Sequence, residues 1–88
     1  MTADEFSEEL RKEGFDNFVL VEREANGTLD HHSHPFEAKA LILEGEIRIV
    51  VGGKENTYRT GDVFHLAHSV DHVETYGPQG VRYLVGRR

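Results

Sequence analysis

Apolar and polar positions alternate with a period of two along much of the chain after Gly14. The segment Glu46-Ile47-Arg48-Ile49-Val50-Val51 shows this alternation and then meets Gly52-Gly53, which is typical of a half-buried strand that ends in a tight turn. Turn signals such as Asn26-Gly27 and Gly77-Pro78-Gln79-Gly80 recur about every eight to ten residues. Around eight short strands between such turns predict an all-β sandwich or small barrel rather than parallel βαβ units. The expected strands are residues 18–23, a segment around 32–34, and residues 38–43, 46–51, 56–59, 63–67, 72–76 and 81–85.

The first fourteen residues have a helical pattern instead. Thr2 and Glu5 have the spacing of a capping box, in which each side chain bonds the backbone amide of the other residue. Phe6 and Leu10 lie four positions apart and would share one face, and Gly14 is a typical helix stop. We therefore expect one short amphipathic helix at about residues 3–13, which packs through a narrow apolar stripe. A frayed acidic tail is the alternative, because helices this short are marginal alone.

The length of 88 residues is that of one domain, so we expect a single unit over residues 1–88 with the barrel at about residues 18–86. A chain of this size buries only roughly 60% of the surface that its unfolded form exposes. Burial against a second subunit would add to this modest core. We therefore expect a homodimer.

Charge and composition exclude several classes of protein. Acidic residues outnumber basic ones by 16 to 10, which argues against a nucleic-acid partner, since such proteins carry a basic surface. There is no cysteine, so disulfides and thiolate metal sites are absent. No signal peptide opens the sequence and no apolar run is long enough to cross a membrane, so we expect a cytoplasmic protein with no membrane partner.

All six histidines lie between residues 31 and 72, at positions 31, 32, 34, 65, 68 and 72. Imidazole is the commonest protein ligand of divalent transition metals. In a strand, His32 and His34 project from the same face, about 6.5–7 Å apart along the backbone, and could converge on one ion. His31 has the opposite parity and is expected to face solvent. The pair alone is a weak signal, because exposed polar residues on an edge strand give the same pattern.

The second histidine cluster strengthens the metal hypothesis, because His72 follows a turn and begins a strand that could lie beside the first pair. His65 alternates with apolar neighbours and is expected to face outward, and His68 is expected to be solvated in the turn. Glu74 shares a face with His72 and could orient or replace a ligand. An exposed strand carboxylate is the favoured interpretation of Glu74.

Two spaced motifs resemble those of the cupin superfamily. His32-Ser33-His34 followed by Gly45 is similar to cupin motif one, and Gly61 and His72 have the spacing of motif two. In motif two, Ala67 and Ser69 stand where proline and glycine are usual, and Tyr76 replaces the usual asparagine. The resemblance covers about residues 18–86. It implies a small cupin, that is, a double-stranded β-helix or jelly-roll barrel, here with one short N-terminal α-helix.

The resemblance also implies a metal site made by His32, His34 and His72. Glu37 is expected as a fourth ligand from the loop after Pro35, although it lies one position before the usual glutamate, where this chain has Ala38. Gly27 is also one residue nearer to His32 than the motif requires. The metals known in cupins are iron, manganese, nickel, zinc and copper, and a histidine site does not choose among them.

Several functions are compatible with such a domain. The first is a metal-dependent enzyme, dioxygenase-like or isomerase-like, that acts on a small molecule in the barrel. The second is a non-catalytic domain that binds or senses a small ligand, with or without metal. A third is a cupin whose site is empty. The sequence contains no nucleophile elbow, no phosphate loop and no evident general acid or base beyond the expected ligands.

Overall fold

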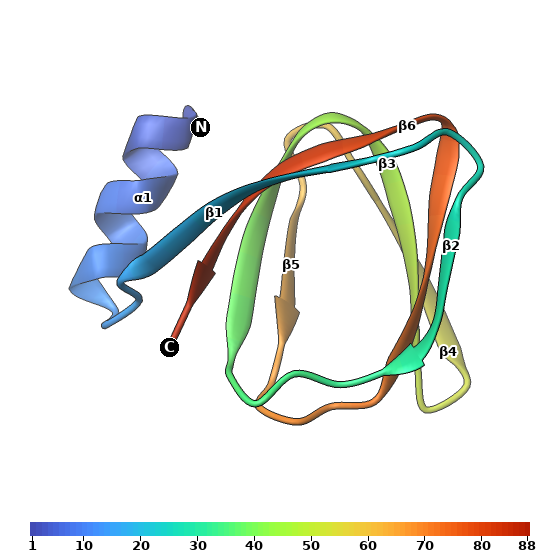
Figure 1. The fold of residues 1–88 in the computed structure, drawn as a ribbon. Coiled ribbons are helices and arrows are strands. Elements are labelled where there is room, and N and C mark those ends of the chain that lie inside the picture. The colour runs from blue at the N-terminus through green and yellow to red at the C-terminus, as the bar shows by residue number, and fades with distance from the viewer.

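A computed structural model describes residues 1–88 and confirms a mostly β protein with one N-terminal helix (Figure 1). Six strands follow the helix and form one antiparallel sheet that curls into a barrel. No helix is long and apolar enough to cross a membrane. The elements are α1 (Ala3–Lys12), β1 (Asn17–Arg23), β2 (Thr28–His32), β3 (Ala38–Val51), β4 (Lys54–Arg59), β5 (Val63–Leu66) and β6 (His72–Arg87).

Helix α1 has the expected cap and the expected apolar stripe. The Thr2 hydroxyl accepts from the Glu5 amide at 3.1 Å, and the Glu5 carboxylate accepts from the Thr2 amide at 3.0 Å. The helix ends one residue earlier than expected, and the chain turns at Gly14, whose φ of 95° favours glycine. Phe6 and Leu10 are buried in a small cluster with Phe15 and Leu41. This cluster attaches α1 to the outside of the barrel, where partly buried side chains of β1, β3 and β6 pack against it (Figure 1).

The two long strands β3 and β6 pair with each other along most of their length, and every other strand pairs with one of them. Strands β1 and β2 pair with the two ends of β6, and β5 and β4 pair with the two ends of β3. The sheet therefore has two halves. One half has the order β1, β6, β3, β5, and the other has the order β2, β6, β3, β4.

The expectation of about eight separate strands is wrong, because two expected pairs each form one continuous strand. Residues 38–43 and 46–51 belong to β3, and residues 72–76 and 81–85 belong to β6. The expected turn Gly77-Pro78-Gln79-Gly80 lies inside β6. The chain bends there instead of reversing, with Gly45 and Gly80 at φ values of 77° and 74° and register shifts in β3 on both sides of Glu44 and Gly45.

The bends direct side chains from both halves into one core. In β6 the buried positions are even before the bend, as in Tyr76, and odd after it, as in Val81, Tyr83 and Val85. Apolar residues of β3 and the phenylalanine of β5 complete the same cluster. The buried polar residues of the molecule are His72 and Glu74, both on the inner face of β6. Their position inside the barrel marks the candidate site.

Candidate metal centre

Pairing between β2 and β6 brings the two histidine clusters together. His32 is the last residue of β2, and its register partner is His72, the first residue of β6. Although these residues are forty positions apart in the sequence, their ring centroids are 4.1 Å apart. Two residues beyond His32, His34 places its ring centroid 5.0 Å from that of His32. The structure therefore brings the three expected histidines together.

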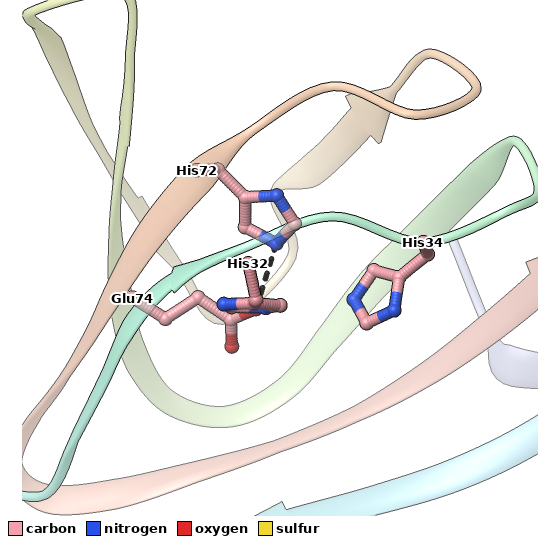
Figure 2. Close-up of side chains that lie close together, drawn as sticks. All are labelled: His32, His34, His72 and Glu74. Carbon is pink, nitrogen blue, oxygen red and sulfur yellow. Dashed lines mark hydrogen bonds and ion pairs between the residues drawn. The ribbon is translucent and has the colours of Figure 1, made fainter.

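A carboxylate completes the group. Figure 2 shows three imidazoles and the Glu74 side chain directed into the same small space. One potential ligand atom from each residue lies within 4.8 Å of the others. His72 and Glu74 are only 1% and 6% exposed, so this space is largely closed to solvent. We call this set the four-residue cluster: His32, His34, His72 and Glu74.

Backbone carbonyls fix the tautomers of two of the imidazoles. Nδ1 of His32 lies 2.7 Å from the Asp30 carbonyl oxygen, and Nδ1 of His72 lies 3.0 Å from the Val70 carbonyl oxygen. A carbonyl oxygen only accepts hydrogen bonds, so each Nδ1 carries a proton and donates it. In the neutral imidazole, Nε2 then has a free lone pair, which is the form that binds a metal.

Both free Nε2 atoms lie 3.0 Å from the same oxygen, Oε2 of Glu74. An unprotonated imidazole nitrogen and a carboxylate oxygen are both acceptors, so each of these contacts needs a positive charge or a proton between the two atoms. One proton on Glu74 could serve one nitrogen but not both. Charging both rings would place two imidazolium ions side by side. A single cation placed between the two Nε2 atoms and Oε2 of Glu74 would be bound by all three acceptors at once. The donor set therefore fits a metal ion.

Tyr76 holds the other oxygen of Glu74. Its hydroxyl donates to Oε1 at 3.2 Å, and both side chains are buried. Burial, and then the charge of Glu74, raises the pKa of Tyr76, so the hydroxyl keeps its proton at neutral pH. Tyr76 therefore fixes the carboxylate with Oε2 toward the imidazoles.

His34 differs from the other two histidines because neither ring nitrogen has a hydrogen-bond partner. Its ring stacks on Phe36, with centroids 4.9 Å apart and planes inclined by 16°. Burial lowers the pKa of His34, and the neighbouring His32 and His72 lower it further. The ring is therefore held in its neutral form, with its nitrogens free.

Glu37, the expected fourth ligand, lies elsewhere. Its Oε2 is 2.5 Å from Nε2 of His65, and its Oε1 accepts from Nε of Arg88 at 2.6 Å. These hydrogen bonds, first that of Arg88 and then that of His65, lower the pKa of Glu37. Its backbone exchanges two hydrogen bonds with Arg88, which turns the side chain away from the barrel interior. The structure does not bring Glu37 to the four-residue cluster.

Glu74 is the residue that sequence reasoning undervalued. The favoured interpretation, an exposed strand carboxylate, is wrong, because Glu74 is 6% exposed and touches two of the histidines. The signal was its place two residues after His72 on one strand, which puts both side chains on the same face. The remaining histidines lie outside the cluster: His31 pairs with Asp71 at 3.0 Å on the surface, and His68 bonds its neighbour Ser69.

A cavity of about 80 Å³ lies beside the cluster inside the barrel. His34 and Glu74 form part of its wall, so the cluster borders the cavity directly. The rest of the wall is mostly apolar and comes from β1, β2, β3, β5, β6 and the loop before β3. It includes two arginines, Arg23 and Arg87. A small molecule in this cavity would lie next to an ion held by the cluster.

Comparison with known proteins gives one family match and several similar folds. The family model of the cupin domain matches residues 19–84. No curated protein sequence matches the chain significantly.

Three solved structures illustrate the similarity of the fold. The cupin domain of Schizosaccharomyces pombe Cnp3 is 18% identical with a TM-score of 0.72, and the match covers 80% of this chain and 53% of that one. The DMSP lyase DddQ of Ruegeria pomeroyi is 24% identical with a TM-score of 0.73, covering 81% of this chain and 36% of the lyase. An oxalate decarboxylase variant of B. subtilis is 16% identical with a TM-score of 0.71, covering 80% and 20%. The chain thus spans about half or less of the length of these three proteins, and the identities show a shared fold.

Proposed function

Because the chain belongs to the cupin domain family, and because its barrel gathers three imidazoles and a carboxylate, we propose that it binds one divalent transition metal ion and acts on a small molecule beside that ion. The four-residue cluster supplies the ligands. Imidazole with one carboxylate suits iron, manganese, nickel, copper or zinc. A bound ion would act as a Lewis acid or a redox centre for a molecule in the adjoining cavity.

One observation carries this proposal. Two imidazole nitrogens that have no proton lie 3.0 Å from one carboxylate oxygen, inside the core. Buried acceptors that face one another destabilise a protein unless a cation or a proton lies between them. The arrangement is therefore stable with an ion in place and unfavourable without one.

The chain prepares this site through residues that would not touch the ion. The Asp30 and Val70 carbonyls keep the protons of His32 and His72 on Nδ1. The Tyr76 hydroxyl fixes the carboxylate of Glu74. Such partners orient the ligands before the ion arrives, which raises its affinity.

The cavity favours a catalytic role for the ion over a purely structural role. An ion that served only to stabilise the fold would be enclosed by its ligands, whereas a catalytic ion borders a space that a substrate can enter. Here two members of the cluster line a cavity with apolar walls, which would exclude bulk water from a bound molecule. Two proteins of similar fold are a lyase and a decarboxylase, which agrees with this choice.

Metal uptake tests the proposal. The wild type, Glu74→Gln and Glu37→Gln would each be stripped of metal, incubated with manganese, iron, nickel or zinc, desalted and analysed for metal by mass spectrometry. We expect about one ion per chain for the wild type with at least one of these metals, and the same for Glu37→Gln. We expect a loss of affinity of about tenfold or more for Glu74→Gln, because the amide removes the negative ligand. Equal uptake by wild type and Glu74→Gln, or none by either, would contradict the proposal.

A further inference from the structure

The cavity wall contains Arg87, a cation without a hydrogen-bond or ion-pair partner. Arg87 lies near the end of β6 and has the same parity as Tyr83 and Val85, so its side chain starts toward the barrel interior. Its Nε atom is buried and makes no hydrogen bond. No ion pair involves its guanidinium either.

The neighbouring arginines differ. Arg82 on the same strand also has a buried Nε without a hydrogen bond, but it does not line this cavity, and its guanidinium lies 3.6 and 3.5 Å from the carboxylates of Glu22 and Glu44. Arg88 bonds Glu37. Arg23, the other arginine of the cavity wall, bonds the carbonyl oxygen of Glu22. A buried guanidinium nitrogen without a partner is destabilising, so Arg87 is the group of this cavity that would gain most from an anion.

Phe36 connects Arg87 to the proposed metal site. The guanidinium carbon of Arg87 lies 4.6 Å from the centre of the Phe36 ring, and the His34 ring stacks on Phe36 at 4.9 Å. Phe36 thus contacts both the guanidinium and one of the imidazoles. Arg87, His34 and Glu74 all line the same cavity.

The charges favour an anion in this cavity. With neutral imidazoles, one carboxylate and a divalent ion, the cluster would have a net charge of +1, to which Arg87 and Arg23 of the cavity wall each add a positive charge. The planar guanidinium matches a carboxylate in shape and hydrogen-bonding geometry. The cavity, with a volume of about 80 Å³, is small and admits only a small molecule.

From these observations, and resting on the proposed function, we propose that the molecule taken up beside the metal site is a small carboxylate, with Arg87 binding its carboxylate group. The apolar walls would contact the short carbon part of the ligand. Arg87 is then the residue that determines specificity for an anion.

Acetate and acetamide provide a matched pair of probes, because they have nearly the same shape and differ in charge. Zinc-loaded wild type, Arg87→Gln and Arg82→Gln would be titrated with each probe and followed by two-dimensional amide NMR. Arg82→Gln is the control, since it removes the same charge from the same strand on the outer face. We expect wild type and Arg82→Gln to bind acetate about tenfold or more tightly than acetamide, and Arg87→Gln to lose that preference with its zinc content unchanged.

Zinc content separates this inference from the metal proposal. Equal acetate affinity in wild type and Arg87→Gln at equal zinc content would overturn the inference and leave the metal site standing. A wild type that binds no zinc would contradict the metal site. The metal-free wild type and Arg87→Gln would then be titrated with acetate and acetamide, and equal acetate affinity in the two proteins would overturn the role of Arg87. If Arg87→Gln does not fold, Arg87→Lys replaces it: a several-fold weaker affinity for acetate is expected, and an unchanged affinity would overturn the inference.

Discussion

At the scale of single residues, the orientation of Glu74 determines what the site can bind. Its Oε2 faces two imidazoles, and its Oε1 is held by Tyr76. Rotation of the carboxylate would weaken the site without removing any ligand. Tyr76 is therefore a positioning residue for the proposed metal site.

We predict that Tyr76→Phe lowers metal affinity by about tenfold, the usual effect of losing a hydrogen-bond partner of a ligand. Competition with a chromophoric chelator would measure the affinity. Tyr58→Phe is the matched control, because the Tyr58 side chain packs against the core and its hydroxyl makes no hydrogen bond. An affinity for Tyr76→Phe equal to that of Tyr58→Phe would show that the hydroxyl does not position Glu74.

Glu37 has a structural role, since it joins the loop after Pro35 to His65 and to the C-terminal residue Arg88. Its pKa is lowered in the folded protein, first by the hydrogen bond from Arg88. A lowered folded pKa stabilises the fold above the ordinary value of 4.5, and this stabilisation is lost as the pH falls through the lowered pKa.

We therefore predict that Glu37→Gln lowers the melting temperature at pH 7 by at most a few degrees, roughly the effect of a surface ion pair, because its partners His65 and Arg88 are about half exposed to solvent. The difference from wild type should shrink as the pH is lowered toward 3. Thermal melts followed by circular dichroism at both pH values check this. A difference that stays constant with pH would assign the effect to packing and not to the charge.

The three histidines of the site could be predicted from the sequence, because they belong to two spaced motifs. The expected strand around residues 32–34 is only partly right, since β2 ends at His32 and His34 lies in the loop after it. The carboxylate could not be chosen in the same way. Glu37 and Glu74 each lie two or three positions from a histidine, and the choice depends on which side chain faces the interior. That is decided by the pairing of Glu37 with Arg88 and of β2 with β6, which are contacts between distant residues.

At the scale of elements, the bends in β3 and β6 give the barrel its closed shape. A Cβ atom at Gly45 would overlap the Gly80 carbonyl oxygen, so the two bends lie against each other with no room for a side chain. Gly45 also has a φ of 77°, which L-residues rarely adopt. Both features explain why glycine is required here.

We predict that Gly45→Ala destabilises the protein by about 3 kcal/mol or more, because it adds a backbone clash to an unfavourable φ. Gly53→Ala is the matched control, with a φ of 81° and no atom within 4 Å of the added Cβ. It should lose only about 1–2 kcal/mol. Urea denaturation gives both values, and similar losses in the two variants would refute the packing of the two bends.

The helix and most of the strand segments could be predicted because they depend on local patterns: the capping box at Thr2 and the alternation around Ile47 and Ile49. The joining of short segments into β3 and β6 was missed. Gly45 and Gly77-Pro78-Gln79-Gly80 are turn residues by composition, and they form bends because the neighbouring strand continues past them.

At the scale of the whole molecule, we propose a homodimer. A chain of 88 residues has a small core, and Leu20 and Leu29 on β1 and β2 are 49% and 41% exposed. Light scattering after size exclusion should give twice the monomer mass of 10.0 kDa at micromolar concentration. A single species at the monomer mass would contradict this proposal.

The central claim is that one metal ion binds among the four residues of the cluster, and a crystal grown with zinc tests it most directly. Anomalous scattering measured at the zinc edge locates the ion independently of the protein atoms. We predict one peak per chain inside the barrel, within about 2.0–2.2 Å of ligand atoms from the four residues His32, His34, His72 and Glu74. An empty cluster, or a peak only at Glu37 and His65, would contradict the account.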